Sequence, residues 1–126
     1  MKKYCLLMLL IAGFIACKKE GSDLAIVGKW ELRHESGGWG VDRSHAPGNG
    51  NIYEFKASQF TKTTPNDTTI TGRYSINLDR NENNYKTGTI IFNNSENAEP
   101  IRFNTDTLFI GTSVADGIVW EYVKIK

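Results

Sequence analysis

A strict alternation of apolar and polar side chains between residues 69 and 78 constrains the fold of this chain more than any other feature. One face of that segment carries Ile70, Gly72, Tyr74, Ile76 and Leu78, while Thr69, Thr71, Arg73, Ser75 and Asn77 share the other. A period of two predicts a β-strand with one buried and one solvated face. No stretch after Gly21 repeats apolar residues at helical spacing over three turns, so we expect an all-β fold.

Similar short apolar runs recur along the chain, separated by Gly, Asn, Asp and Pro residues that favour turns. We expect eight strands, near residues 27–35, 52–56, 59–64, 69–78, 86–93, 101–103, 107–112 and 118–126. An up-and-down antiparallel barrel is the simplest arrangement because closure removes exposed strand edges. Eight strands enclose room for side chains or for one small ligand. A two-sheet sandwich is the alternative that this pattern leaves open.

The first residues of the chain predict export and lipid attachment. Lys2 and Lys3 precede an apolar run at 4–15, which is shorter than the roughly 20 residues of a membrane-spanning helix and fits a signal peptide. The run ends in Phe-Ile-Ala-Cys at 14–17, which resembles a lipobox. We therefore expect a lipoprotein signal peptide at 1–16, a lipid on Cys17, a tether at 17–23 and one domain at 24–126. The alternative is an ordinary signal peptide that is cleaved without lipid attachment.

Charge and cysteine content exclude several classes of function. Removal of residues 1–16 takes two lysines from the 15 Lys and Arg residues and leaves the 14 acidic residues, so the mature domain is nearly neutral. A near-neutral domain predicts no nucleic-acid partner. Cys5 is removed with the signal peptide and Cys17 is consumed by the lipid, so no thiol remains for a disulfide or a metal. We expect no cofactor.

The segment 36–51 is rich in glycine, and we expect it to form a long loop beside the mouth of the barrel. Trp39 stands among three glycines, where it either covers the mouth as a lid or packs against the barrel wall. His34, Asp42 and His45 are a candidate metal trio, but nothing in their spacing makes three ligands converge. We therefore expect no metal site.

Candidates for catalysis are equally weak. Ser44 and His45 are only sequence neighbours, and no Gly-x-Ser-x-Gly elbow occurs. The alternation places four glutamates mostly on solvent faces, namely Glu31, Glu35, Glu54 and Glu121. We therefore expect no catalytic residues and no enzymatic activity.

A set of aromatic residues is expected to face inward and to contact a ligand if the interior holds a cavity: Tyr53, Phe55, Tyr74, Phe92, Phe103 and Trp120, joined by Trp39 from the loop. Simple core packing explains the same residues. Gly72 and Gly88 favour a cavity, because missing side chains at inward positions leave room, although a bulge explains them equally well. Thr68, within the Asp-Thr-Thr motif at 67–69, resembles an O-glycosylation site of exported proteins.

Several short motifs, in the same order, resemble the lipocalin-like lipoproteins of Bacteroidetes. They are Gly-Lys-Trp-Glu-Leu at 28–32, Ser-Gly-Gly at 36–38, Pro-Gly-Asn-Gly at 47–50, Gly-Arg-Tyr-Ser-Ile at 72–76 and Tyr-Val-Lys-Ile at 122–125. The resemblance covers nearly all of residues 24–126 and implies a calyx-shaped barrel with an apolar ligand. It also implies structural roles for Gly28, Trp30 and Lys124, with the tryptophan plugging the closed end beneath the lysine.

Together these observations predict a lipid-anchored cell-envelope protein, most simply on the outer membrane. We expect its barrel to bind a small apolar or amphipathic ligand without catalysis. The alternative is a solid-cored module that binds protein or glycan through its surface, with Trp39 as an exposed anchor. The sequence leaves the choice between these two functions open.

Overall fold

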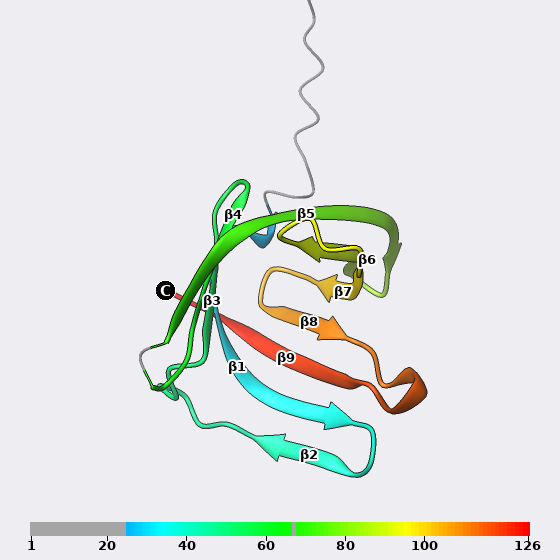
Figure 1. The fold of residues 1–126 in the computed structure, drawn as a ribbon. Helices are drawn as coiled ribbons and strands as arrows, with labels where there is room; N and C mark the ends of the chain where they lie inside the picture. Colours follow the sequence, from blue (N-terminus) through cyan, green and yellow to red (C-terminus); the bar gives the residue numbers. More distant parts are fainter. Residues whose placement is uncertain (1–24, 67) are drawn as a thin grey trace, which may run out of the picture.

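Eight antiparallel strands close into a barrel in the computed structural model, which describes residues 25–66 and 68–126 (Figure 1). The barrel strands are β1 (Gly28–Gly37), β3 (Ile52–Phe55), β4 (Gln59–Thr63), β5 (Thr69–Glu82), β6 (Tyr85–Phe92), β7 (Glu99–Phe103), β8 (Thr107–Gly111) and β9 (Ile118–Ile125). A further strand, β2 (Val41–Ser44), lies outside this ring. The described residues hold no α-helix, only short 3-10 turns. The predicted signal peptide, tether and lipidation at Cys17 fall outside the described residues.

Pairing between β1 and β9 closes the barrel. Each strand from β3 to β9 pairs with its neighbour in the chain, and Lys29 pairs with Ile125 of β9 on one side and with Glu54 of β3 on the other. A single closed sheet confirms the predicted barrel and excludes the two-sheet sandwich. Ala25 and the ends of β7 and β9 lie at one end of the barrel, which we call the closed end; the opposite end is the mouth.

The expected loop at 36–51 is partly wrong, because it contains β2. Pairing of β1 with β3 stops at Glu31 and Ile52, which leaves the rest of that edge of β1 free. Residues Val41–Ser44 fold back onto this edge, opposite Gly37 to His34. Free backbone groups at a strand edge favour such pairing, so residues up to Ser44 form a hairpin with β1, while 45–51 form a loop as expected.

A β-bulge in β1 changes which side chains face the interior. The register against β9 shifts between Leu32 and His34, so Arg33 is the extra residue. Because one inserted residue reverses the alternation, Glu35 then lies opposite Trp120 on the inner side of the strand. The expectation that Glu35 faces solvent is therefore wrong.

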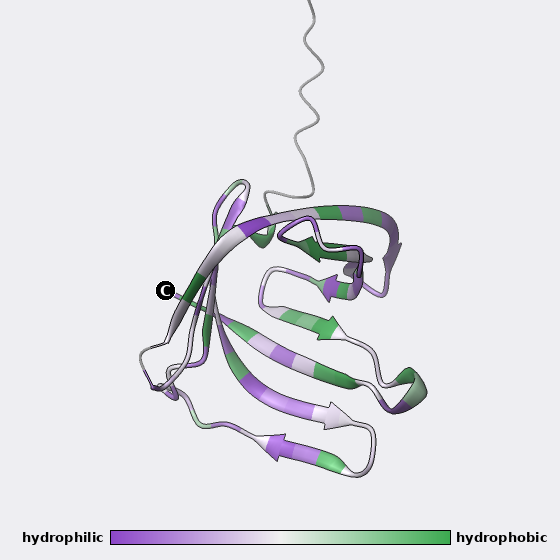
Figure 2. Ribbon diagram, in the orientation of Figure 1, coloured by the Kyte–Doolittle hydropathy of each residue, from purple (hydrophilic) through white to green (hydrophobic). Residues whose placement is uncertain are grey.

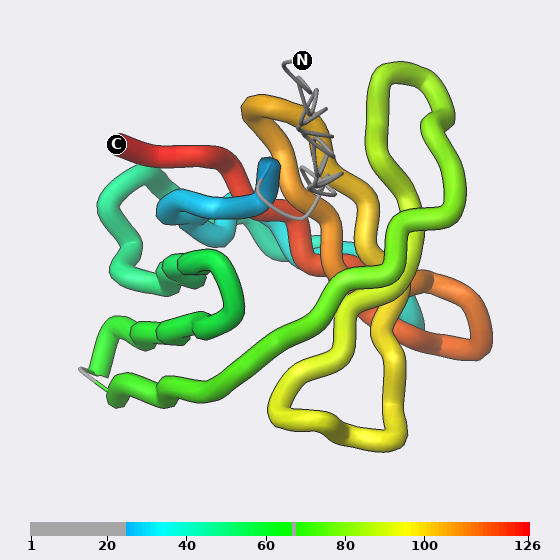
Figure 3. The backbone as a smooth tube through the Cα atoms, turned by 90° about the horizontal axis from the view of Figure 1, so that it is seen from above, coloured from blue at the N-terminus to red at the C-terminus, as the bar shows by residue number. Residues whose placement is uncertain are grey.

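A second bulge lies in β5, between Leu78 and Arg80, and it allows this strand to run four residues beyond the expected end. Asn83 and Asn84, both at positive φ, then form the turn into β6. Figure 3 shows β5 in light green crossing the barrel, with the β5–β6 and β6–β7 turns at opposite ends.

Gly88 pairs with Leu78 beside this bulge, and an added Cβ at Gly88 would lie 2.0 Å from the Asn77 carbonyl oxygen. At Gly72 an added Cβ would lie 2.0 Å from the Asn93 amide oxygen. The space that a side chain would take is therefore already filled, by the β5 backbone at Gly88 and by the Asn93 side chain at Gly72, and Gly88 fits the bulge interpretation better than the cavity interpretation.

The core consists of inward-facing aromatic and aliphatic side chains that fill the middle of the barrel. Apolar and polar residues alternate along the strands, as the coloured bands in Figure 2 show. Tyr53 stacks on Phe55 and Phe92 at centroid distances of 5.3 and 5.7 Å, and Phe60 meets Phe92 edge-on at 4.8 Å.

Candidate functional site

A small cleft opens at the mouth, and we call it the mouth cleft. Its volume is about 170 Å³, and its lining includes Leu32, Glu35, Tyr53, Lys62, Trp120 and Tyr122. The Nζ of Lys62 lies 5.1 Å from the centroid of the Tyr53 ring, an arrangement that favours a cation over an aromatic face. The cleft is too small for a typical drug-sized ligand.

Glu35 organises one wall of the mouth cleft. Its Oε1 accepts a hydrogen bond from the Trp120 indole at 3.1 Å, and its Oε2 lies 2.8 Å from His45 Nε2. The pKa of the Glu35 carboxyl is lowered from its usual value of 4.5, mainly by the hydrogen bond to His45. Burial raises this pKa, whereas the hydrogen bond from Trp120 and the charge of Arg43 lower it further. Both carboxylate oxygens of Glu35 are therefore hydrogen-bonded, one to Trp120 and the other to His45. These bonds hold the side chain in the wall of the cleft, so the carboxylate is not a free general base.

Two tyrosines bordering the mouth cleft stay protonated at physiological pH. Burial, reinforced by the negative charge of Glu99, raises the pKa of Tyr53 to about 12. Burial also raises the pKa of Tyr122, with further contributions from Tyr53, Glu35 and Glu99. Their neutral hydroxyls can donate hydrogen bonds but are poor general bases.

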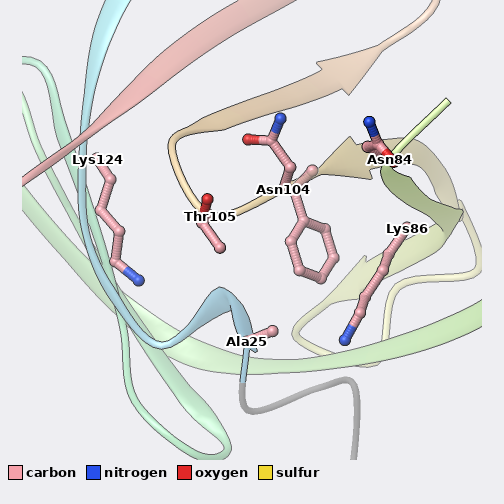
Figure 4. A pocket seen from close by; sticks show the side chains of 7 residues that line it. Ala25, Asn84, Lys86, Asn104, Thr105 and Lys124 are labelled. Carbon is pink, nitrogen blue, oxygen red and sulfur yellow. The ribbon is translucent and has the colours of Figure 1, made fainter.

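A larger pocket of about 600 Å³ lies at the closed end (Figure 4), and we call it the closed-end pocket. Phe103, which is fully buried, supplies its apolar wall together with Ala25. Asn84, Lys86, Asn104, Thr105 and Lys124 supply the polar lining. Its volume is in the usual range of small-molecule sites.

The strand register explains why two lysines reach this pocket. Lys86 pairs with Phe103, and Lys124 pairs with Trp30; both aromatic residues are fully buried. Directly paired residues project from the same face of a sheet, so both lysines extend from the inner face of the barrel wall, Lys86 half-buried and Lys124 exposed at the rim. Figure 4 shows their side chains reaching from opposite sides, with Ala25 between them.

The structure confirms the expected arrangement of Trp30 and Lys124. The Lys124 ammonium lies 5.2 Å from the centroid of the Trp30 ring, and the Trp30 indole donates a hydrogen bond to the Ile26 carbonyl oxygen at 2.8 Å. Gly28 permits this contact, because a Cβ there would lie 2.8 Å from Cε of Lys124. These three residues therefore pack together at this end of the barrel.

The predicted aromatic residues divide among three positions. Tyr53, Phe55, Tyr74 and Phe103 are buried, and Phe92 and Trp120 pack partly buried against them, as expected for an inward-facing set. Tyr53 and Trp120 line the mouth cleft, whereas Phe103 alone of the set lines the closed-end pocket. Tyr74 and Phe55 meet edge-on at 5.0 Å within the core.

Trp39 lies at the tip of the β1–β2 hairpin and is 93% exposed. The expectation that it packs against the barrel is therefore wrong, and it does not cover the mouth in this structure. Thr68 is also exposed, in the turn between β4 and β5, and its proposed glycosylation stays a prediction.

The candidate metal trio is split into two pairs. His34 Nε2 lies 2.7 Å from Asp42 Oδ1, whereas His45 pairs with Glu35. His34 and Glu35 are neighbours on one strand and point to opposite faces, so the two pairs do not converge. Within residues 25–66 and 68–126, no group of three His, Cys, Asp or Glu side chains is arranged to hold a metal ion.

Sequence reasoning missed the environment of Glu31. This side chain is almost fully buried because the 45–51 segment folds over it: the Gly48 amide donates to both carboxylate oxygens at 3.0 and 3.1 Å. Arg33 Nη2 lies 2.8 Å from the same carboxylate. The expectation of a solvated Glu31 is wrong, since the alternation of a strand cannot show a loop that covers its outer face.

Comparisons with protein-family models, curated proteins and solved structures found no match to this chain. Among the residues that the structure describes, none forms a helix long and apolar enough to cross a membrane.

Proposed function

We propose that this chain is a lipid-anchored protein of the bacterial cell envelope, related to the lipocalin-like lipoproteins, that binds a small amphipathic ligand without catalysis. The closed-end pocket carries the ligand-binding part of the proposal. It combines a buried aromatic wall, Phe103, with polar groups at its rim in a volume of about 600 Å³. The lipobox-like ending at Cys17 supports the anchoring part.

The position of the pocket differs from the expectation for a calyx. The mouth holds only about 170 Å³, and stacked rings fill the middle of the barrel. A ligand of ordinary size therefore fits the closed end better than the mouth. The two histidine pairs and the occupied Glu35 carboxylate support a binding role over a catalytic one.

Native mass spectrometry of the protein purified from its own host tests this proposal. We expect a mass increment above that of the lipidated chain, removed by organic extraction and reduced when Phe103 is replaced by Ala. Phe55→Ala, which alters a buried ring outside the pocket lining, is the matched control for loss of core packing. A bare lipidated mass under gentle conditions contradicts ligand binding.

One observation favours the second candidate, a surface-binding module. Trp39 is 93% exposed and Val114 is 74% exposed, and the two lie on adjacent turns because Gly38 donates a backbone hydrogen bond to Gly117 at 3.0 Å. Two exposed apolar side chains on neighbouring turns suit a protein contact. Cross-linking in cells tests this function: a reproducible partner that is lost in Trp39→Ala, without loss of folding, favours it over ligand storage.

A further inference from the structure

The barrel interior carries different charges at its two ends. At the mouth, Glu35 lines the cleft, and Glu99 pairs with the fully buried Ile90, so both carboxylates face inward alongside Lys62. At the closed end the inward-facing charged side chains are Lys86 and Lys124. The inward-facing charges at the closed end are therefore both positive, whereas those at the mouth are mixed. Asp106, in the β7–β8 turn at the closed end, is exposed and forms no ion pair with either lysine.

The two lysines of the closed-end pocket have no acidic partner within the described part of the chain. The ion pairs found there involve Lys29, Arg33, Arg43, Arg80, His34 and His45, and none includes Lys86 or Lys124. None of the residues that line the pocket is Asp or Glu. Lys86 is half-buried, and Lys124 is exposed at the rim beside the buried Trp30. Two ammonium groups beside an apolar wall favour an anion, because charge-assisted hydrogen bonds are stronger than neutral ones.

We propose that the closed-end pocket binds a single-chain amphiphile with a phosphate or carboxylate head group. The head group lies between the ammonium groups of Lys86 and Lys124, which reach in from opposite sides of the pocket (Figure 4). The apolar part of the ligand lies against Phe103. This proposal rests on the ligand-binding function proposed above and names the class of ligand.

The place of the pocket in the chain indicates where such a ligand comes from. Ala25 borders the pocket and follows Cys17 by eight residues. At roughly 3.3–3.6 Å per extended residue, the pocket lies within about 30 Å of a lipid on Cys17. An anionic head group can therefore come from the anchoring membrane or from a free amphiphile, and both sources share the same chemistry.

Isothermal titration calorimetry on the full chain carrying Cys17→Ser tests the head group, because this chain has no acyl anchor that competes for the pocket. The probes are octyl phosphate, octanoate, octanol and inorganic phosphate. We expect octyl phosphate and octanoate to bind with a 1:1 stoichiometry, and octanol to bind about tenfold more weakly, a difference of about 1.4 kcal/mol. Inorganic phosphate, which lacks the apolar part, is expected to bind more weakly than octyl phosphate.

Three variants and one matched control locate the site. Lys86→Gln and Lys124→Gln are each expected to weaken octyl phosphate binding by about tenfold while octanol binding stays unchanged. Lys62→Gln removes an inward-facing lysine at the opposite end of the barrel and is expected to change neither affinity. Lys86→Arg is expected to restore most of the affinity, because it keeps the charge. Circular dichroism on each variant checks that the barrel is folded.

The outcomes separate this proposal from the function on which it rests. If octanol binds as tightly as octyl phosphate, the anionic head group is wrong, but ligand binding stands. If Lys62→Gln weakens binding and the closed-end variants do not, the site is the mouth cleft and this proposal is overturned. If none of the probes binds to the folded chain, both proposals are overturned.

A final arm distinguishes the two sources of the head group. The lipidated wild-type protein is placed in vesicles of phosphatidylcholine alone or with phosphatidylglycerol, and octyl phosphate is titrated into each. If octyl phosphate binds the wild type more weakly in the vesicles that contain phosphatidylglycerol, and binds Lys86→Gln equally in both kinds of vesicle, membrane head groups occupy the pocket. Equal binding in both vesicles supports a free amphiphile as the ligand.

Discussion

The ammonium group of Lys124 lies over the ring of Trp30, 5.2 Å from its centroid, and the same side chain borders the closed-end pocket. The same residue thus packs over the buried Trp30 and contributes to the candidate ligand site. An anion bound in the pocket would interact with the Lys124 ammonium group, which also contacts the Trp30 ring. Stability and ligand affinity are therefore coupled through this pair.

Replacing Lys124 by Met is expected to lower the free energy of unfolding by about 0.5–2 kcal/mol, because the cation over the indole is lost while the aliphatic stem is kept. Lys124→Arg keeps a cation over the ring and is expected to stay within about 0.5 kcal/mol of the wild type. Urea unfolding followed by circular dichroism measures both values. A Met variant as stable as the wild type contradicts a stabilising role for this contact.

Glu31→Ala is expected to destabilise the protein by about 1.5–3 kcal/mol, because it leaves the Gly48 amide and Arg33 without their charged acceptor. Hydrogen exchange at the Gly48 amide should speed up, since its acceptor is removed. Glu54→Ala is the matched control: its carboxylate is 4.0 Å from Lys29 in a half-exposed pair, which is worth about 0–1 kcal/mol. Equal losses in the two variants contradict an anchoring role for Glu31.

Stability is expected to fall in acid through Glu35. The hydrogen bond from His45 lowers the folded-state pKa of this carboxyl below 4.5, so the unfolded chain binds the proton more tightly than the folded chain. The contribution is therefore complete above the unfolded pKa and is lost as the pH falls through the folded pKa. Urea midpoints measured from about pH 7 to about pH 3 should converge for wild type and Glu35→Gln at the acid end. Parallel curves contradict this linkage.

Gly88→Ala is expected to cost about 1–3 kcal/mol of stability, because the new methyl group meets the β5 backbone at the bulge. Its Cβ would lie 2.0 Å from the Asn77 carbonyl oxygen and 2.8 Å from the Leu78 Cα, neither of which is a flexible side-chain atom. Ser75→Ala, at an exposed position of β5, serves as the control. A Gly88→Ala chain of wild-type stability shows that β5 can shift at this bulge.

Cys17→Ser is expected to move the protein out of the membrane fraction, because serine has no thiol to accept the lipid. The domain should keep its near-ultraviolet circular dichroism, since the barrel residues are unchanged. Fractionation and incorporation of labelled palmitate measure the effect. Wild-type protein that is soluble, with an unmodified Cys17, contradicts lipid anchoring.

Alternation of side chains was enough to predict the barrel, because most strands keep one buried face. Alternation predicted β5 near residues 69–78 and the inward-facing aromatic residues. The arrangement of Trp30 and Lys124 was implied by the resemblance to lipocalins, and the contact is present. Alternation failed where the period breaks. The extra residue Arg33 in β1 turned Glu35 inward, and the bulge after Leu78 carried β5 beyond its expected end.

The candidate site was harder to predict than the fold. Lys86 lies on the same alternating face of β6 as Ile90, so the sequence pattern contained a signal for an inward-facing lysine. A lysine near the start of a strand is also typical of a turn, and for that reason the signal was missed. The pocket itself depends on how strand ends from β5 to β9 meet in space. The burial of Glu31 depends on the path of the 45–51 segment, which no local periodicity records.

The closure of the barrel between β1 and β9 also determines when the protein can fold. Lys29 and Ile125 are paired although 96 positions separate them, so the ring stays open until almost all of the described domain has been synthesised. Contacts of such long sequence separation slow folding. A ribosome-bound or translocating chain therefore presents unpaired strands for most of its synthesis. Late closure is compatible with the export proposed above, because a chain must be unfolded to pass through a narrow membrane channel.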